Sequence, residues 1–254
     1  MGTALCLTTG CLSPKYKRAS KKTPPAFTLN VNFPPAPLET TLNTLIISGG
    51  PGSWKKEAFW DEYVVTFHNS RDQPFQVASV ELMDFTGSPK QPGEDPWKLE
   101  RESKSLAKRY QDAGMTVVRV AAPRVLVSAA ESSGAASAAI GGAGAATAAT
   151  ATAAALPVYG ATVLGINLHN RKAIMTEFNR RRLRLPLVLA AGETRTGSLF
   201  FPMVPNPQSL IVSWSSESGD SRVGDSVLPL DFLRGLHVKE AQARDTSSPT
   251  TGRD

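Results

Sequence analysis

The sequence predicts an α+β protein in which two groups of β-strands flank a helical insertion. Residues 62–69 alternate apolar and polar side chains with a period of two, which is typical of a half-buried strand. The period changes to that of a helix after Asp95-Pro96. A stretch of 39 residues without a formal charge, Ser132 to Asn170, then separates these elements from a second group of strand patterns.

Composition and charge exclude several classes of protein. The 254 residues are 41% hydrophobic and 20% charged, as expected of a folded chain. Two cysteines exclude a disulfide-dense scaffold, and three separated histidines give no basis for a metal or cofactor. The net charge of +6 is concentrated in residues 1–40, net +4, and 167–184, net +5. Neither segment has aromatic residues spaced for base stacking, so nucleic acid is not the expected partner. Membrane lipids are expected to bind these basic segments instead.

The N-terminal residues resemble a bacterial lipobox. A short apolar run ends in Thr9-Gly10-Cys11, with small residues before the cysteine and Leu7 close to the leucine position of that motif. The resemblance implies lipid attachment at Cys11, and the shortness of the run implies a start further upstream. Residues 1–40 would then be a Pro-rich, basic tether that spaces the folded part from a membrane. The alternative is a disordered cytosolic N-terminus.

The first half of the strands is expected within residues 41–90. The alternation within 75–85 slips between Val77 and Val80, which indicates a β-bulge. The glycine run at 49–52 lacks the Gly-Lys-Ser/Thr of a phosphate loop and is expected to be a turn. The expected strands are 42–48, 62–69 and 75–85.

The insertion, residues 91–184, is expected to hold two helices. The first begins at Asp95-Pro96 and ends near Gly114, and the second covers about 168–183 with Asn170 as N-cap. Strands return in residues 185–236, and residues 237–254 are expected to be a disordered tail. The returning strands are 185–190, 195–201, 208–214 and 226–232.

Two segments resemble small immunoglobulin-like domains of bacterial envelope lipoproteins. Tyr63 to Asn69, followed by Gln73-Pro74-Phe75, is similar to their opening strand, and Ala191 to Pro202 is similar to their pGE-x-x-x-G-x-L-x-F hairpin. The resemblance implies an immunoglobulin-like antiparallel β-sandwich, here interrupted by a helical hairpin insertion. Its motifs are structural and carry no catalytic residues, so an enzyme is not expected.

Three hypotheses remain open for the Ala/Gly-rich stretch. It is long enough for a membrane-associated helical hairpin with a turn near Leu156-Pro157, but it has few strongly apolar residues. A soluble Ala-rich helical pair and a disordered insertion are the other two. Small residues allow close helix packing, as in glycine-zipper segments, and the candidates are Gly134, Gly141, Gly142 and Gly144.

Three sets of side chains are candidates for function. Cations after the insertion are expected to contact lipid headgroups: Arg171, Lys172, Arg180, Arg181 and Arg182. Four aromatic residues are expected to pack in the core and against a helix, or else to form a ligand surface: Trp54, Phe59, Trp60 and Trp97. Gly-Asp-Ser triplets at Ser221 and Ser226 give only weak support for a hydrolase.

The sequence therefore favours a non-enzymatic, membrane-anchored lipoprotein of the bacterial cell envelope, with a structural or interaction role and an unidentified protein partner. A lipid on Cys11 would place it at the outer membrane or the periplasmic face. The alternative is an integral membrane accessory or assembly factor that forms homo-oligomers through the Ala/Gly-rich hairpin.

Overall fold

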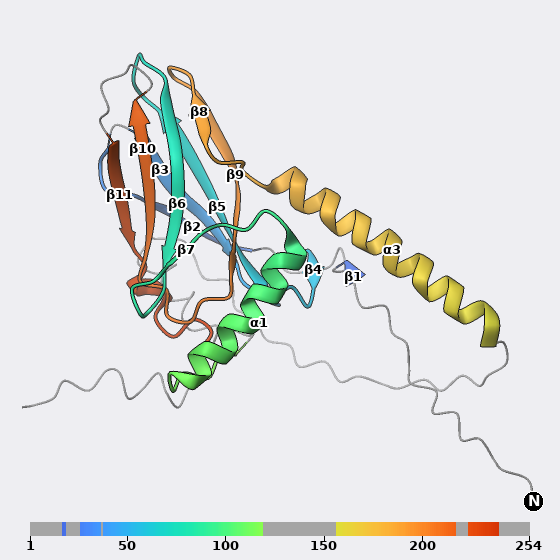
Figure 1. Ribbon diagram of the computed structural model, residues 1–254. Helices are drawn as coiled ribbons and strands as arrows, with labels where there is room; N and C mark the ends of the chain where they lie inside the picture. The colour runs from blue at the N-terminus through green and yellow to red at the C-terminus, as the bar shows by residue number, and fades with distance from the viewer. Residues whose placement is uncertain (1–16, 19–25, 37, 119–155, 217–222, 239–254) are drawn as a thin grey trace, which may run out of the picture.

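The computed structural model describes residues 17–18, 26–36, 38–118, 156–216 and 223–238. Two antiparallel sheets form the body and lie in two layers (Figure 1). The first sheet has the order β2 (Phe27–Asn32), β3 (Leu38–Ile46), β5 (Trp60–Asn69), β9 (Thr194–Pro202). The second has the order β11 (Val223–Pro229), β10 (Ser209–Ser216), β6 (Phe75–Met83), β7 (Pro89–Lys90), and β8 (Leu187–Leu189) also pairs with β6.

Five further described elements lie beside these sheets. The two-residue strands β1 (Lys17–Arg18) and β4 (Lys55–Lys56) pair with each other. The helices are α1 (Pro96–Asp112) and α3 (Leu156–Arg181), and a short 3-10 turn, η1, covers Asp231–Leu233. Figure 1 shows α3 extending away from the sheets, with its C-terminal end at the body.

The core lies between the two sheets because alternate side chains of each strand point inward. Inward residues are at most 1% exposed in both sheets: Leu42, Val65, Phe67 and Leu199 in the first, and Val80, Leu82, Leu210 and Val212 in the second. This architecture confirms a β-rich α+β fold.

Strands from before and after the insertion pair directly with each other. β5 pairs with β9 from Trp60–Pro202 to His68–Thr194, and β6 pairs with β10. The predicted bulge is confirmed: Ser213 is opposite Ser79 while Trp214 is opposite Val77, which leaves Ala78 as the extra residue. Each sheet therefore requires both flanks of the insertion.

Both ends of the body extend further than the sequence predicted. Residues 27–32, expected within the tether 1–40, form β2 at the edge of the first sheet, because Leu29 is an apolar side chain that enters the core and is 2% exposed. His237 and Val238, expected in the tail 237–254, are buried, and Val238 pairs with Val117. Residues 27–32 and 237–238 therefore belong to the body.

The first helix begins as predicted. The Asp95 carboxylate accepts hydrogen bonds from the amides of Trp97 (2.7 Å) and Lys98 (2.9 Å), and Pro96 occupies the first helical position. Gly114 follows the helix with a φ of 83°, a conformation that glycine adopts without strain.

The second helix is longer than predicted. It begins at Leu156 rather than near 168, so Asn170 lies inside the helix and is not its N-cap. The turn expected near Leu156-Pro157 is replaced by the first helical turn, where proline is tolerated because its missing N–H would have no partner there. Neither described helix is long and apolar enough to cross a membrane. Residues 119–155, with Gly134, Gly141, Gly142 and Gly144, lie outside the described residues, as does Cys11.

Candidate functional site

The predicted aromatic group gathers where both helices meet the first sheet. A second apolar cluster, called here the docking cluster, consists of Trp54, Ala58, Trp60, Leu99, Phe178 and Phe200. The ring of Phe178 in α3 stacks on that of Phe200 in β9, with centroids 4.1 Å apart, and meets Trp60 edge-on at 6.1 Å. The docking cluster therefore holds the C-terminal half of α3 on the body, as the core interpretation expected.

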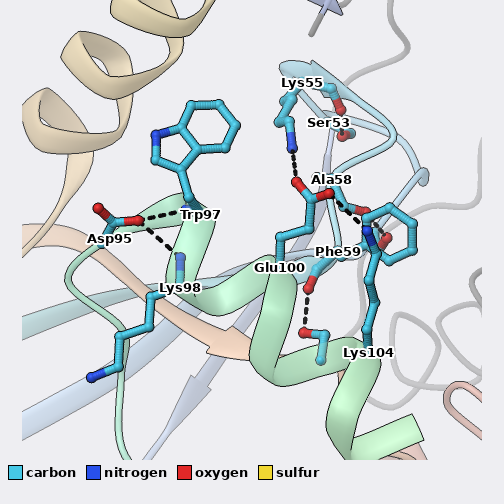
Figure 2. A network of polar contacts seen from close by, with 11 residues as sticks. Ser53, Lys55, Ala58, Phe59, Asp95, Trp97, Lys98, Glu100 and Lys104 are labelled. Carbon is cyan, nitrogen blue, oxygen red and sulfur yellow. Dashed lines mark hydrogen bonds and ion pairs between the residues drawn. The ribbon is translucent and has the colours of Figure 1, made fainter. Parts of the chain in front are cut away.

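The other two aromatic residues belong to the contact with α1. The carbonyl of Phe59 accepts a hydrogen bond from the Ser103 hydroxyl, and the Lys104 ammonium lies 4.6 Å from the Phe59 ring (Figure 2). Trp97 is at the start of α1 and is 6% exposed. Both rings are thus part of helix docking.

A buried lysine lies between these aromatic rings. The Lys55 side chain is 2% exposed, and its ammonium is 3.3 Å from the Glu100 carboxylate (Figure 2). It also lies 4.3 Å from the Trp60 centroid and 5.3 Å from that of Trp97, within cation–π range. Burial favours a raised pKa for Glu100, but Lys104 and Lys55 hold that pKa below its ordinary value. The ionised pair joins β4 to α1.

A buried glutamate fixes the end of α3. Glu62, 2% exposed, accepts hydrogen bonds from the Trp54 indole (2.8 Å) and the Ser198 hydroxyl (2.6 Å), and pairs with Arg181 at 3.3 Å. Arg181 also binds Glu177 at 2.7 Å. Hydrogen bonds from Arg180 are the main cause that lowers the pKa of Glu177 to about 2. Charge pairing therefore reinforces the docking cluster at this end of the helix.

The five predicted headgroup contacts fall into two groups. Arg181 and Arg182 point into the body, the latter donating to the Glu94 carbonyl at 2.8 Å with a side chain that is 14% exposed. Arg171, Lys172 and Arg180 are exposed. Arg171 lies 5.1 Å above the Trp97 ring, and Arg180 pairs with Glu177 while remaining 66% exposed. Only the second group is available to a partner.

An open groove separates the start of α1 from α3. It has a volume of about 370 Å³ and is lined by Asp95, Trp97, Leu168, Arg171, Lys172 and Met175, among others. Leu168 is 68% exposed, the largest exposed fraction among the large apolar side chains that the structure describes. Apolar and cationic groups thus meet on this side of α3.

A second polar centre is fully enclosed. His237 Nε2 is 2.8 Å from Asp61 Oδ2, and His237 Nδ1 is 3.0 Å from the Val118 carbonyl. Asp61 also accepts the Ser48 amide at 2.9 Å. Burial favours a lowered pKa for His237, but Asp61 and the Val118 carbonyl raise that pKa above its ordinary value. Because both neighbours are acceptors, both ring nitrogens donate and the imidazole is protonated.

This arrangement leaves the histidine without a free nitrogen to act as a base. The Ser48 hydroxyl is likewise occupied, donating to the Ala58 carbonyl. Ser226, the described candidate nucleophile, is a buried residue of β11, and Ser221 lies outside the described residues. Sequence reasoning missed the His237 contact because its partners are 119 and 176 residues away.

Within the described part of the chain, no group of three or more His, Cys, Asp or Glu side chains is placed to hold a metal ion. No protein-family model matches the chain, and neither curated proteins nor solved structures give a match. The chemistry on which a function can be argued is therefore the exposed cations around α3 and the groups that dock the helix.

Proposed function

We propose that this protein is a non-enzymatic, membrane-anchored lipoprotein of the bacterial envelope, attached through Cys11 and serving a structural or interaction role. The observation that carries the proposal is the division of the cations on α3 and directly after it. Two arginines hold the helix to the body, while Arg171, Lys172 and Arg180 remain exposed on an element that projects from it. Such cations favour anionic headgroups.

The strand order supports an immunoglobulin-like sandwich for the body. The strands can be labelled in chain order: β3 is A, β5 is B, β6 is C, β8 is C′, β9 is E, β10 is F and β11 is G. The sheets then have the orders A-B-E and C′-C-F-G. Immunoglobulin-like domains place A, B and E in one sheet and C, F and G in the other. Domains of this class serve many binding roles, so the fold itself selects no ligand.

The engaged polar groups support a non-enzymatic role. Each buried ionic contact described above joins separate elements: Lys55–Glu100 joins β4 to α1, Glu62–Arg181 joins β5 to α3, and His237–Asp61 joins the end of the described chain to β5. These groups are used for docking, whereas a catalytic group must have an atom available to substrate.

Palmitate labelling tests the anchor. The gene would be expressed in a bacterial host together with the DNA upstream of its first codon, as wild type, Cys11→Ala and the matched control Cys6→Ala. We expect label on wild type and on Cys6→Ala, but none on Cys11→Ala. Absence of label from wild type, or label that persists in Cys11→Ala, would overturn the lipoprotein proposal.

Cell fractionation of the same strains separates this proposal from the alternative of an integral membrane protein. A lipoprotein held by Cys11 and surface charge leaves the membrane fraction when Cys11→Ala cells are extracted with high salt, because salt screens exposed charges. Membrane association of Cys11→Ala that resists high salt would contradict the proposal and favour anchoring through residues 119–155.

A further inference from the structure

We propose that the β1–β4 ladder and α3 together form one cationic face that lies against the headgroups of an anionic bilayer. The face consists of Lys17, Arg18, Lys56, Arg171, Lys172 and Arg180, all exposed. This inference deepens the proposed function. The part of it that rests on that function is that the face orients a body anchored by a lipid on Cys11. It adds a second element, β1–β4, to the cations of the helix.

The β1–β4 ladder brings four cations together. Lys17 is opposite Lys56, and Arg18 is opposite Lys55. Like charges directly opposite each other on paired strands are destabilising. Glu100 neutralises Lys55, but among the described residues no carboxylate pairs with Lys17, Arg18 or Lys56. An anionic surface would relieve the repulsion that the fold leaves uncompensated.

Contacts join this ladder to the helix. Strand β1 lies against α3 (Figure 1). The Trp97 ring connects the two groups of cations, because Lys55 of β4 lies 5.3 Å from its centroid and Arg171 of α3 lies 5.1 Å from it. Two carboxylates beside the helix have partners: Glu177 binds Arg180 and Arg181, and Asp95 caps α1. The ladder and the helix therefore carry their exposed cations on adjoining elements of the body.

The length of chain before β1 fixes which way this face points. Five residues, 12–16, separate Cys11 from Lys17. Six extended steps span at most about 20 Å, less than the roughly 40 Å length of a 26-residue helix. A lipid on Cys11 therefore keeps β1 close to the bilayer. The side of the body that carries β1 and α3 must then be the side that faces the membrane.

The aromatic residues favour a bilayer over single-stranded nucleic acid. Proteins that bind single strands stack bases on accessible aromatic rings. Here Trp60 and Trp97 are 3% and 6% exposed, and the ammonium of Lys55 lies beside both rings. The accessible groups of the face are charges and the exposed Leu168 next to Arg171, a combination suited to headgroups and the acyl boundary.

Vesicle binding tests the face without the anchor. Purified full-length Cys11→Ala protein would be titrated with vesicles of phosphatidylcholine alone and of phosphatidylcholine with phosphatidylglycerol. We expect binding only to the anionic vesicles, weakening as salt increases. Removing three cations that lie near an anionic surface should weaken binding about 100-fold.

Three triple variants in that background distinguish the cationic face from general basicity. Lys17→Gln/Arg18→Gln/Lys56→Gln removes the β1–β4 half, and Arg171→Gln/Lys172→Gln/Arg180→Gln removes the helix half. The matched control, Arg71→Gln/Arg101→Gln/Lys108→Gln, removes exposed cations elsewhere. Circular dichroism melting would establish that each variant is folded. Both face variants should lose binding, and the control should stay within threefold of the parent.

Several outcomes would overturn the inference. They are equal binding to both kinds of vesicle, full binding by the β1–β4 variant, or tighter binding of a single-stranded oligonucleotide than of anionic vesicles at equal salt. The result is separable from the lipoprotein test. Palmitate label without vesicle binding removes only the face, and vesicle binding without label removes only the anchor.

Discussion

The Nε2 atom of His237 lies 2.8 Å from Oδ2 of Asp61, and the two side chains are 0% and 1% exposed. The pair connects β5 to the last described residues of the chain. The Nδ1 bond to Val118 adds a third segment, and the Val118 amide returns a hydrogen bond to the His237 carbonyl at 2.9 Å. Two segments 119 residues apart are thereby fixed at one place.

Stability should decrease as pH rises because of this pair. The pKa of folded His237 is raised, so folding favours the protonated form. Its stabilising effect is complete below the ordinary pKa of about 6.5 and is lost as pH rises through the folded value. Urea unfolding of wild type between pH 5.5 and 9.5 should show a decreasing free energy of unfolding. The His237→Gln variant should show a smaller decrease over that range, and equal slopes would contradict the assignment.

Removing the aspartate should cost more than removing a surface carboxylate. Asp61→Ala leaves a buried imidazolium and the Ser48 amide without their acceptor. Breaking a buried ion pair typically costs about 3–5 kcal/mol. The control, Asp72→Asn in the exposed β5–β6 turn, should change stability by less than about 0.5 kcal/mol. Urea unfolding at pH 6 provides both values, and a cost below 1 kcal/mol for Asp61→Ala would show that the pair is dispensable.

Two adjacent arginines should behave differently. Arg181→Gln removes a partner of buried Glu62, and hydrogen bonds to charged groups are worth about 1.5–3 kcal/mol. Arg180→Gln removes only a surface pair with Glu177, which solvent screens. Hydrogen exchange at the amides of residues 167–181 should accelerate in Arg181→Gln and remain near wild type in Arg180→Gln. Similar exchange in the two variants would contradict the docking role of Arg181.

The stacked ring of Phe178 should be the strongest single contact of α3. It is completely buried against Phe200 and Trp60. Truncation of a buried phenylalanine to alanine costs about 3–5 kcal/mol. Leu168→Ala, on the same helix but 68% exposed, should cost less than about 0.5 kcal/mol. Urea unfolding would measure both, and a Phe178→Ala variant as stable as Leu168→Ala would argue against the docking cluster.

Asp84 should make the protein sensitive to acid. Burial favours a raised pKa, but hydrogen bonds from Thr86, Ser88, Lys90 and Tyr110 lower the pKa of Asp84 to about 2. A depressed pKa stabilises the fold above the unfolded value of about 3.9, and this effect is lost as pH falls toward 2. Wild type should exceed Asp84→Asn by about 2 kcal/mol at pH 7, with the difference shrinking below pH 4. Urea unfolding at pH 7, 4 and 3 measures this, and a constant difference would refute it.

Local sequence patterns were sufficient for most of the elements. The alternation in 62–69, the slip at Val77–Val80 and the Asp95-Pro96 cap each involve neighbouring residues only, and the structure contains the corresponding strands, bulge and helix start. Periodicity and capping act within a few residues of chain, so they can be recognised without knowledge of the fold. The edge strand β2 was missed although Phe27, Leu29 and Val31 alternate with polar residues, because the prolines on both sides of it indicated a tether.

The chain by itself determined that cations cluster around residues 167–184 and that aromatic residues surround Lys55. Only the tertiary structure decided what each one does. Lys55 is buried beside Glu100 while Lys56 is exposed, and Arg181 pairs with Glu62 while Arg180 remains at the surface. Neighbours of the same charge type acquire opposite environments because burial and pairing depend on carboxylates that are 45 and 119 residues away.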